Sequence, residues 1–434
     1  MRRHFLLAGA AIVLLGSSVV AWRASAQAGG TLLWAVGDMA RCAPGKSASR
    51  AAADVIGAAP ARPILTIGDH VYPDGTASEF TNCFNPVWGG FKSRMWPTLG
   101  NHEYRTEDAT GYFGYFGAIG NWYARTANGW QILALDSNCS ELGGGCVPGS
   151  PQYQWLEAQL RDDPHDCQLA YFHHPRWSQG EHGNSAIVSP LYKLLVAYGV
   201  ELAINGHEHI YQRYQALDGN GAPNANGVVE IVVGTGGADH TTGNTANLPA
   251  PAVRNSTAFG ALSIELKAAS WSTTFVPEAG RSFTDTAGGN CHGSGTAPPP
   301  TTTTTTIGPG STTTTTAPGG NGQLPDSTVS QPRPGATMTT PVTFTGNATD
   351  DGGVSKVRTA IRNQQTLQWL QADGTFGPTF RLFDAQLSAP GTRSTAWTWN
   401  RSLAPGSYGL SVRAIDTAGQ VETATPWVTF TVAA

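Results

Sequence analysis

Five short apolar runs in the first half of this 434-residue chain are each followed closely by residues that bind metal ions in proteins. The runs span residues 32–36, 64–67, 95–99, 169–172 and 202–204, and a glycine or a proline lies near the end of each. Segments with helical character, at 47–59, 152–162 and 191–198, lie between several of the runs. Buried strands that alternate with helices indicate a layered α/β domain, in which ligands collect at the carboxyl ends of the strands. The pattern therefore predicts one crevice shared by five strand ends.

The residues that follow these runs offer oxygen and nitrogen ligands of different kinds. Each one taken alone is most simply a turn or loop residue, because Gly-Asp and similar pairs are common in turns. Together they place carboxylates, a phenol, an amide and imidazoles at the same end of successive strands, and such a mixed set suits a pair of metal ions. The predicted metal ligands are Asp38, Asp69, Tyr72, Asn101, His173, His207 and His209.

The spacing of these residues resembles the five sequence blocks of the calcineurin-like metallophosphoesterases. In this chain the blocks read Asp38, Asp69-x-x-Tyr72, Gly100-Asn101-His102-Glu103, His173 and Gly206-His207-x-His209. A tyrosine three residues after the second aspartate narrows the resemblance to the purple acid phosphatase branch. The segment from His173 to Gly183 is also similar to the tartrate-resistant members of that branch. The resemblance covers roughly residues 31–290 and implies a four-layer α/β/β/α fold.

The resemblance also implies a role for each residue. It places Asp38, Tyr72 and His209 on one metal, Asn101, His173 and His207 on the other, and Asp69 between them. A phenolate is a strong donor to a trivalent ion, so Fe(III) is expected beside Tyr72 and a divalent Zn, Mn or Fe ion at the second position. Such a pair of ions supplies metal-bound hydroxide as the nucleophile. His102 and His182 are expected to be catalytic, stabilising phosphoryl charge and protonating the leaving alkoxide.

The resulting prediction is an acid phosphatase that hydrolyses monoesters of a small phosphorylated substrate. A phosphodiesterase or nucleotide pyrophosphatase could use the same metals, and the sequence does not show the pocket shape that decides between them. The alternative from another class is a wall-binding protein with a degenerate catalytic domain, which the intact ligand positions disfavour. A net charge of −4 gives no broad basic face, so nucleic acid is not an expected partner. Glu103 is expected either to orient His102 or to face solvent, and His70 and His174 are given no chemistry.

Composition divides the chain into four parts. Residues 1–28 resemble an export signal, and Arg2-Arg3 near its start also resembles the twin-arginine signal. The catalytic domain is expected over 29–292, and a Thr/Pro/Gly-rich linker over 293–323. Short strands and turns alternate over 324–434, which predicts an all-β, immunoglobulin-like sandwich. Such domains serve as spacers or bind cell-wall polymers, and the sequence leaves both roles open. The chain is therefore expected to be secreted or displayed at the cell surface.

The chain contains six cysteines, and an even number in an exported protein favours disulfides. Cys139 and Cys146 flank three consecutive glycines, which form a loop flexible enough to close on itself, so these two are predicted to pair. The pairing of the other four cannot be derived. Because a linker of the predicted kind transmits little stabilisation, a chain ending near residue 292 is expected to remain soluble and active.

Overall fold

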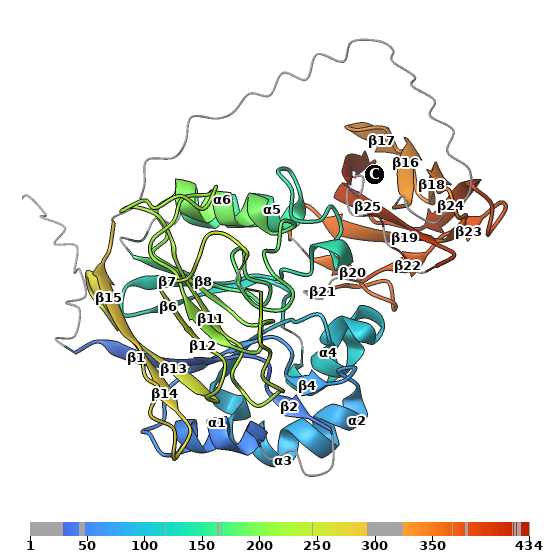
Figure 1. Ribbon diagram of the computed structural model, residues 1–434. Coiled ribbons are helices and arrows are strands. Elements are labelled where there is room, and N and C mark those ends of the chain that lie inside the picture. Colours follow the sequence, from blue (N-terminus) through green and yellow to red (C-terminus); the bar gives the residue numbers. More distant parts are fainter. Residues whose placement is uncertain are drawn as a thin grey trace, which may run out of the picture.

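The computed structural model describes residues 29–42, 48–117, 119–162, 165, 167–244, 246–292, 324–366, 368–377, 381–418, 420, 422 and 427–433. The predicted signal at 1–28 and linker at 293–323 lie outside these residues. An α/β domain and a smaller all-β domain are visible in Figure 1. Across the described ranges, no helix is both long enough and apolar enough to cross a membrane.

The first sheet of the α/β domain holds three of the five predicted strand ends. Its parallel strands are β1 (Thr31–Val36), β3 (Ile64–Ile67) and β5 (Met95–Thr98). The antiparallel strands β13 (Gly260–Lys267), β14 (Ser270–Pro277) and β15 (Thr286–Asn290) extend the sheet beyond β1. Because β1, β3 and β5 are parallel, the residues that follow them lie at the same edge of the sheet.

The second sheet holds the other two predicted strand ends. Its parallel strands are β7 (Trp130–Ala134), β8 (Gln168–Tyr171), β9 (Leu202–Asn205) and β11 (Val229–Val233). The outer strands are β6 (Tyr123–Ala127), β10 (Tyr211–Arg213) and β12 (Val253–Asn255). Strand β7 is fully buried and was not among the predicted runs.

Three layers of hydrophobic side chains join the sheets and helices into four layers. Side chains alternate along β1, so Leu33 faces the second sheet while Trp34 faces the helices of the outer layer. That layer contains α1 (Ala48–Gly57), α2 (Ala77–Glu79), α3 (Asn85–Trp88) and α4 (Thr110–Phe116). Helices α5 (Pro151–Asp162) and α6 (Ser189–Ala197) cover the outer face of the second sheet (Figure 1). The predicted α/β/β/α arrangement is confirmed.

The C-terminal domain is a sandwich of two sheets, as predicted. One sheet contains β16 (Asp326–Gln331), β18 (Val342–Thr349), β24 (Ser394–Arg401) and β23 (Gln386–Leu387). The other contains β17 (Ala336–Met338), β26 (Trp427–Val432), β25 (Gly406–Asp416), β19 (Val354–Asn363), β20 (Trp369–Leu370) and β21 (Phe376–Gly377), with β22 (Phe383–Asp384) also paired to β19. The core between the sheets includes Phe344, Trp397 and Val412.

Three disulfides stabilise the α/β domain, and no described cysteine is free. The bonds join Cys42 to Cys83, Cys139 to Cys146 and Cys167 to Cys291. The predicted pairing of Cys139 with Cys146 is confirmed. The third bond joins the start of β8 in the second sheet to the end of β15 in the first. Disulfides persist in oxidising compartments, so this set agrees with a protein that acts outside the cytoplasm.

Candidate metal centre

Three of the predicted ligands form one group at the carboxyl edge of the sheets. Asp38 follows β1, Tyr72 ends the short strand β4 (Val71–Tyr72), and His209 follows β9. The Tyr72 hydroxyl donates a hydrogen bond of 2.8 Å to Asp38 Oδ1 and lies 3.0 Å from His209 Nε2. His209 Nε2 is 3.4 Å from Asp38 Oδ1. Three potential ligand atoms therefore surround one position.

Three further ligands form a second group beside the first. Asn101 Oδ1 lies 3.1 Å from His173 Nε2 and 3.0 Å from His207 Nδ1. Asp69 lies between the groups: its Oδ2 atom is 3.4 Å from His173 Nε2, and its carboxylate also interacts with the Tyr72 hydroxyl. The structure thus brings all seven predicted ligands together, in the two groups that the resemblance implied.

Burial makes this site unfavourable for its own charges in the absence of a cation. Asp38, Asp69 and His173 are at most 2% exposed. Burial and the negative charges of Asp38 and Asp69 raise the pKa of Tyr72 well above its ordinary value. Burial opposes protonation of His173, but the charge of Asp69, the hydrogen bond to Asp69 and the charge of Asp38 together outweigh burial and raise the pKa of His173 to about 10. Buried carboxylates are normally paired or coordinate metals, so this donor set fits bound cations.

The backbone at three of these residues adopts the left-handed region that is unfavourable outside glycine. The φ angles are 59° at Asp38, 47° at Asp69 and 69° at His207. Such residues cost on the order of 1–3 kcal/mol each and cluster at binding and catalytic sites. The approach of the loops is also close: a Cβ atom on Gly100 would lie 2.2 Å from Asp69 Oδ1, so only glycine fits there.

Glu103 plays a part that the sequence did not predict. Its side chain is fully buried, and its carboxylate accepts hydrogen bonds from the backbone N–H groups of Asp69 (2.9 Å), His70 (2.7 Å) and Gly100 (2.7 Å). Both expectations for Glu103 were therefore wrong, because its partners are these backbone groups and the ring of His70, whose Nδ1 atom is 3.3 Å from Glu103 Oε1, and not His102 or solvent. Glu103 fixes the two loops that carry Asp69 and Asn101.

The two predicted catalytic histidines line a cavity of about 430 Å³ over the ligand groups. The backbone N–H of His102 donates a 2.9 Å hydrogen bond to Asp69 Oδ1. The ring of His182 packs on that of His207, with centroids 4.3 Å apart. Hydrogen bonding to Glu208 raises the pKa of His182 above its ordinary value. A raised pKa favours the protonated imidazole that a general acid requires.

Glu208, between His207 and His209, is a second buried carboxylate whose role was not predicted from the sequence. It accepts hydrogen bonds from the backbone N–H groups of His182 (3.2 Å) and Gly183 (2.8 Å), and its Oε2 atom is 3.4 Å from His182 Nδ1. The segment that carries Glu208 is a bend in which His207 has a φ of 69°, so no strand-like alternation in the sequence could have indicated where the Glu208 side chain lies.

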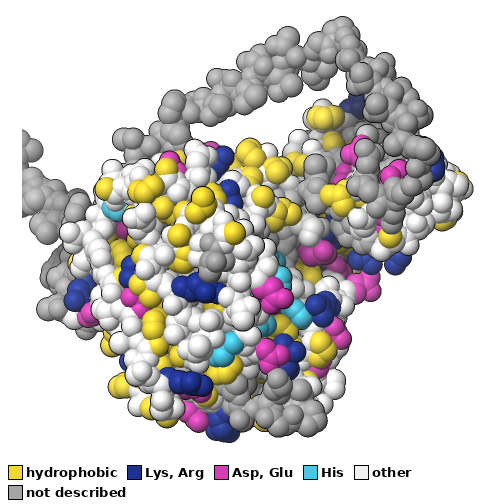
Figure 2. All heavy atoms as spheres, viewed as in Figure 1, with side chains coloured by type: hydrophobic (Ala, Val, Ile, Leu, Met, Phe, Trp, Pro, Cys, Tyr) yellow, Lys and Arg dark blue, Asp and Glu magenta, His cyan; other side chains and the backbone are white. Residues whose placement is uncertain are grey.

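Arginine side chains also line the cavity over the ligand groups, and no motif in the sequence predicted them. Arg41 pairs with Asp239 at 3.3 Å, and Arg105 pairs with Asp74 at 3.5 Å. On the face shown in Figure 2, histidine, acidic and basic side chains lie close together. Guanidinium groups at such a site suit a substrate that carries phosphate.

His70 and His174, which were not expected to take part in the chemistry, lie in different surroundings. His70 is fully buried, and its Nε2 atom lies 2.8 Å from the hydroxyl of Thr66, so its role is structural. His174 lies beside His173 and His207, and the nitrogen atoms of these three rings are close enough to hold one metal ion. Burial lowers the pKa of His174 to about 3, which keeps its ring neutral and able to act as a ligand.

Comparisons with known proteins agree with this geometry. Residues 32–211 match the family model described as calcineurin-like phosphoesterase, and residues 325–412 match that of the bacterial Ig domain. Tartrate-resistant acid phosphatase type 5 of Oryctolagus cuniculus is 41% identical over 71 residues, which is 16% of this chain and 22% of that protein. Purple acid phosphatase 3 of Arabidopsis thaliana is 22% identical over 219 residues, or 43% of this chain and 57% of the other.

The structural comparison extends over a longer segment. A purple acid phosphatase from seeds of yellow lupin (Lupinus luteus) superposes with a TM-score of 0.53 at 18% identity, covering 61% of this chain and 54% of the lupin chain. At this identity the likeness shows the fold alone. Each of these matches spans less than two thirds of the relative's own length.

The chain therefore carries a calcineurin-like metallophosphoesterase domain with homologues among the purple acid phosphatases. A bacterial Ig domain follows it at the C-terminal end. The family implies a dinuclear metal site and phosphoester substrates, and the clustered His and Asp side chains described above are present for such a site.

Proposed function

We propose that this protein is an exported acid phosphatase that hydrolyses phosphate monoesters at a dinuclear metal centre. The observation that carries the proposal is the grouping of the ligands on either side of Asp69. One group contains a carboxylate and a phenol, while the other contains an amide and two imidazoles. The anionic group suits Fe(III), and the neutral group suits a divalent Zn, Mn or Fe ion.

The side chains around the ligands have defined roles in this proposal. Two bound ions would lower the pKa of a coordinated water and neutralise the phosphate oxygens. His102, which lies beside Asp69 at the cavity floor, stabilises the phosphoryl oxygens. His182 donates the proton that the departing alkoxide needs once the P–O bond breaks. Arg41 and Arg105 at the cavity wall attract the anionic substrate.

We further propose the organisation that goes with this activity: an export signal at 1–28, a catalytic domain at 29–292, a linker at 293–323 and an Ig-like domain at 324–434. The three disulfides support export, because such bonds are rare in the cytosol.

Elemental analysis and a visible spectrum of the purified protein test the metal centre. We expect two metals per chain, one of them iron, and a visible band from Tyr72 bound to Fe(III). Tyr72→Phe should remove the band and lower kcat by about tenfold while leaving measurable activity. A band that persists in this variant would exclude tyrosine ligation, and a protein that binds no metal would favour the degenerate wall-binding alternative.

A second measurement separates the phosphatase from its enzymatic rival. We expect phenyl phosphate, a monoester, to be hydrolysed with a higher kcat/KM than diphenyl phosphate, the corresponding diester. A preference for the diester would replace the proposal with a phosphodiesterase on the same metal site.

A further inference from the structure

A second cavity begins at the metal-centre residue Asn101 and extends away from it. Its volume is about 310 Å³, and it shares Asn101 and Arg105 with the cavity over the metal centre. Its wall includes Ser137, Ser140 and Glu141. These side chains offer hydroxyl and charged groups in place of a continuous apolar surface, and a few placed polar groups fix the orientation of a ligand.

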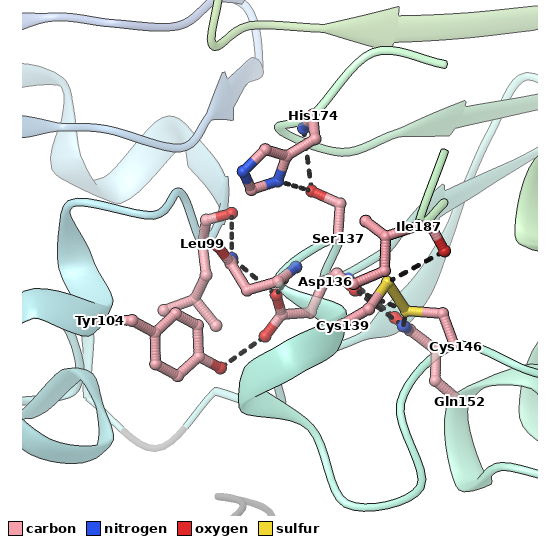
Figure 3. The surroundings of a disulfide bond; sticks show 10 residues. Leu99, Tyr104, Asp136, Ser137, Cys139, Cys146, Gln152, His174 and Ile187 are labelled. Carbon is pink, nitrogen blue, oxygen red and sulfur yellow. Dashed lines mark hydrogen bonds between the residues drawn. A yellow bond between two sulfur atoms is a disulfide. The ribbon is translucent and has the colours of Figure 1, made fainter. Parts of the chain in front are cut away.

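The inner part of this wall is fixed within the catalytic domain, as Figure 3 shows. The carboxylate of Asp136 accepts a 2.6 Å hydrogen bond from the Tyr104 hydroxyl. The side chain of Gln152 bonds to the backbone N–H and to the carbonyl oxygen of Asp136, both at 2.7 Å. The Cys139–Cys146 disulfide closes the loop beside this network.

The outer part of the wall is held by the other domain. Arg413 lies on β25 of the Ig-like sandwich, yet its side chain is only 3% exposed. Its guanidinium donates a hydrogen bond to the Ser140 carbonyl oxygen and lies 3.4 Å from Glu141 Oε2. A buried guanidinium is unfavourable unless it is paired, and both of these partners belong to the cavity wall.

Two further contacts join the domains. Trp122 packs edge to face against Trp369 of the Ig-like domain, with ring centroids 6.5 Å apart. Arg358 pairs with Glu107 at 3.1 Å, although Glu107 is largely exposed. A chain ending near residue 292 would lack Arg413 and its contacts with this wall. The expectation that such a chain keeps its activity stays a prediction.

We propose that the second cavity receives the alcohol part of the phosphate ester. This alcohol is polyhydric, as in a sugar phosphate. Arg413 is a positioning residue for the wall of the second cavity. The proposal rests on the phosphatase activity proposed above and names its substrate class. In the reaction, water gives up a proton to solvent and its oxygen bonds to phosphorus, the ester P–O bond breaks, and the alcohol departs with a proton from His182, which solvent then restores. The Ig-like domain is then part of the substrate site, in addition to any role as a spacer.

The test compares two alkyl esters in the full-length chain. Glucose 6-phosphate places a polyhydric group in the second cavity, whereas the methyl group of methyl phosphate is too small to fill it. We expect the unchanged protein to prefer glucose 6-phosphate. In Arg413→Gln the ratio of the two kcat/KM values should fall about tenfold, through a higher KM for glucose 6-phosphate. Arg413→Lys should recover part of the ratio, because an ammonium group can still pair with Glu141.

Arg358→Gln is the matched control, since it removes an interdomain ion pair that lies outside the cavity. We expect it to change the ratio less than twofold. If Arg413→Gln does not fold, Glu141→Gln breaks the same ion pair from the catalytic domain and should lower the ratio in the same direction. A folded variant with an unchanged ratio, or an unchanged protein that hydrolyses both esters equally well, overturns the proposed subsite and leaves the phosphatase in place. Hydrolysis of no phosphate ester overturns both.

Discussion

Two fully buried glutamates hold the functional loops of this protein, and they hold different parts of the site. Glu103 accepts hydrogen bonds from the loops that follow β3 and β5 in the first sheet, which carry Asp69 and Asn101. Glu208 accepts hydrogen bonds from the segment above the second sheet that carries His182. One carboxylate thus fixes the metal-ligand loops, and the other fixes the proposed acid.

The two regions also differ in their access to solvent. The Asp69 side chain is 2% exposed, whereas that of His182 is 49% exposed. Ligands bind a metal ion more strongly when they are buried away from water, because electrostatic interactions are stronger at low dielectric constant. A group that delivers a proton to a departing alcohol must reach the open cavity. Substitutions in the region held by Glu103 should therefore change the metal content. Substitutions in the region held by Glu208 should change how strongly the rate depends on the leaving group.

Asp69→Asn should have the largest effect, because Asp69 lies between both ligand groups. We expect the loss of at least one metal and a fall in kcat/KM of more than about 100-fold, the upper range for residues that only support ligands. Elemental analysis and phenyl phosphate kinetics measure both quantities. If the Asp69→Asn variant keeps its full metal content and its full activity, Asp69 is not a metal ligand.

His182→Ala tests the second region. General acids contribute roughly 10²–10⁴-fold, so hydrolysis of an alkyl phosphate should slow by about 10²-fold. An activated aryl phosphate, whose leaving group needs little protonation, should slow much less, and the metal content should not change. Equal slowing of both esters would assign His182 to binding or to phosphoryl charge, and loss of a metal would make it a ligand.

Glu103→Gln tests the first region without removing a ligand. An amide in place of the carboxylate leaves at least one backbone N–H without an acceptor, so the free energy of unfolding should fall by about 2–4 kcal/mol. Metal affinity should fall about 10–100-fold. Urea unfolding and metal titration measure these changes. Glu79→Gln is a suitable control, because Glu79 also accepts a backbone hydrogen bond, from Thr76, but does so at the more exposed start of α2.

Glu208→Gln should have the smallest effect of these four substitutions. It tests directly whether the two glutamates have separate roles. Metal content should stay near that of the unchanged protein, while alkyl phosphate hydrolysis should slow by a few-fold more than aryl phosphate hydrolysis, because His182 is held less firmly. If Glu208→Gln instead loses metal to the same extent as Glu103→Gln, the two glutamates do not have separate roles.

The sequence could predict which of the proposed ligands lie close together, because each one follows an apolar run that becomes a strand, within about five residues. A strand end fixes where the following residue lies, so Asp38 and Asn101 could be assigned to one crevice from local patterns alone. Strand β7 was missed, although it is as buried as its neighbours β8 and β9, since none of the predicted ligands follows it to mark its end.

The supporting residues could not be predicted in the same way. Glu103 and Glu208 act on backbone N–H groups 34 and 26 residues away, and a backbone group leaves no mark in the sequence. The contact of Arg413 with Ser140 spans 273 residues and depends on how two domains meet. Local patterns therefore indicated which side chains meet at the proposed site, while tertiary packing determines which residues hold them in place.

The disulfide between Cys167 and Cys291 has a mechanical consequence. Strand β15 lies at the edge of the first sheet and, among the residues that the structure describes, pairs only with β14, so a pull on its C-terminal end would break its hydrogen bonds one after another. Cys291 follows β15 directly and is bonded to Cys167 at the start of β8, inside the second sheet. Tension applied beyond residue 292 therefore passes through a covalent bond into the centre of the domain, and the edge strand carries little of the load.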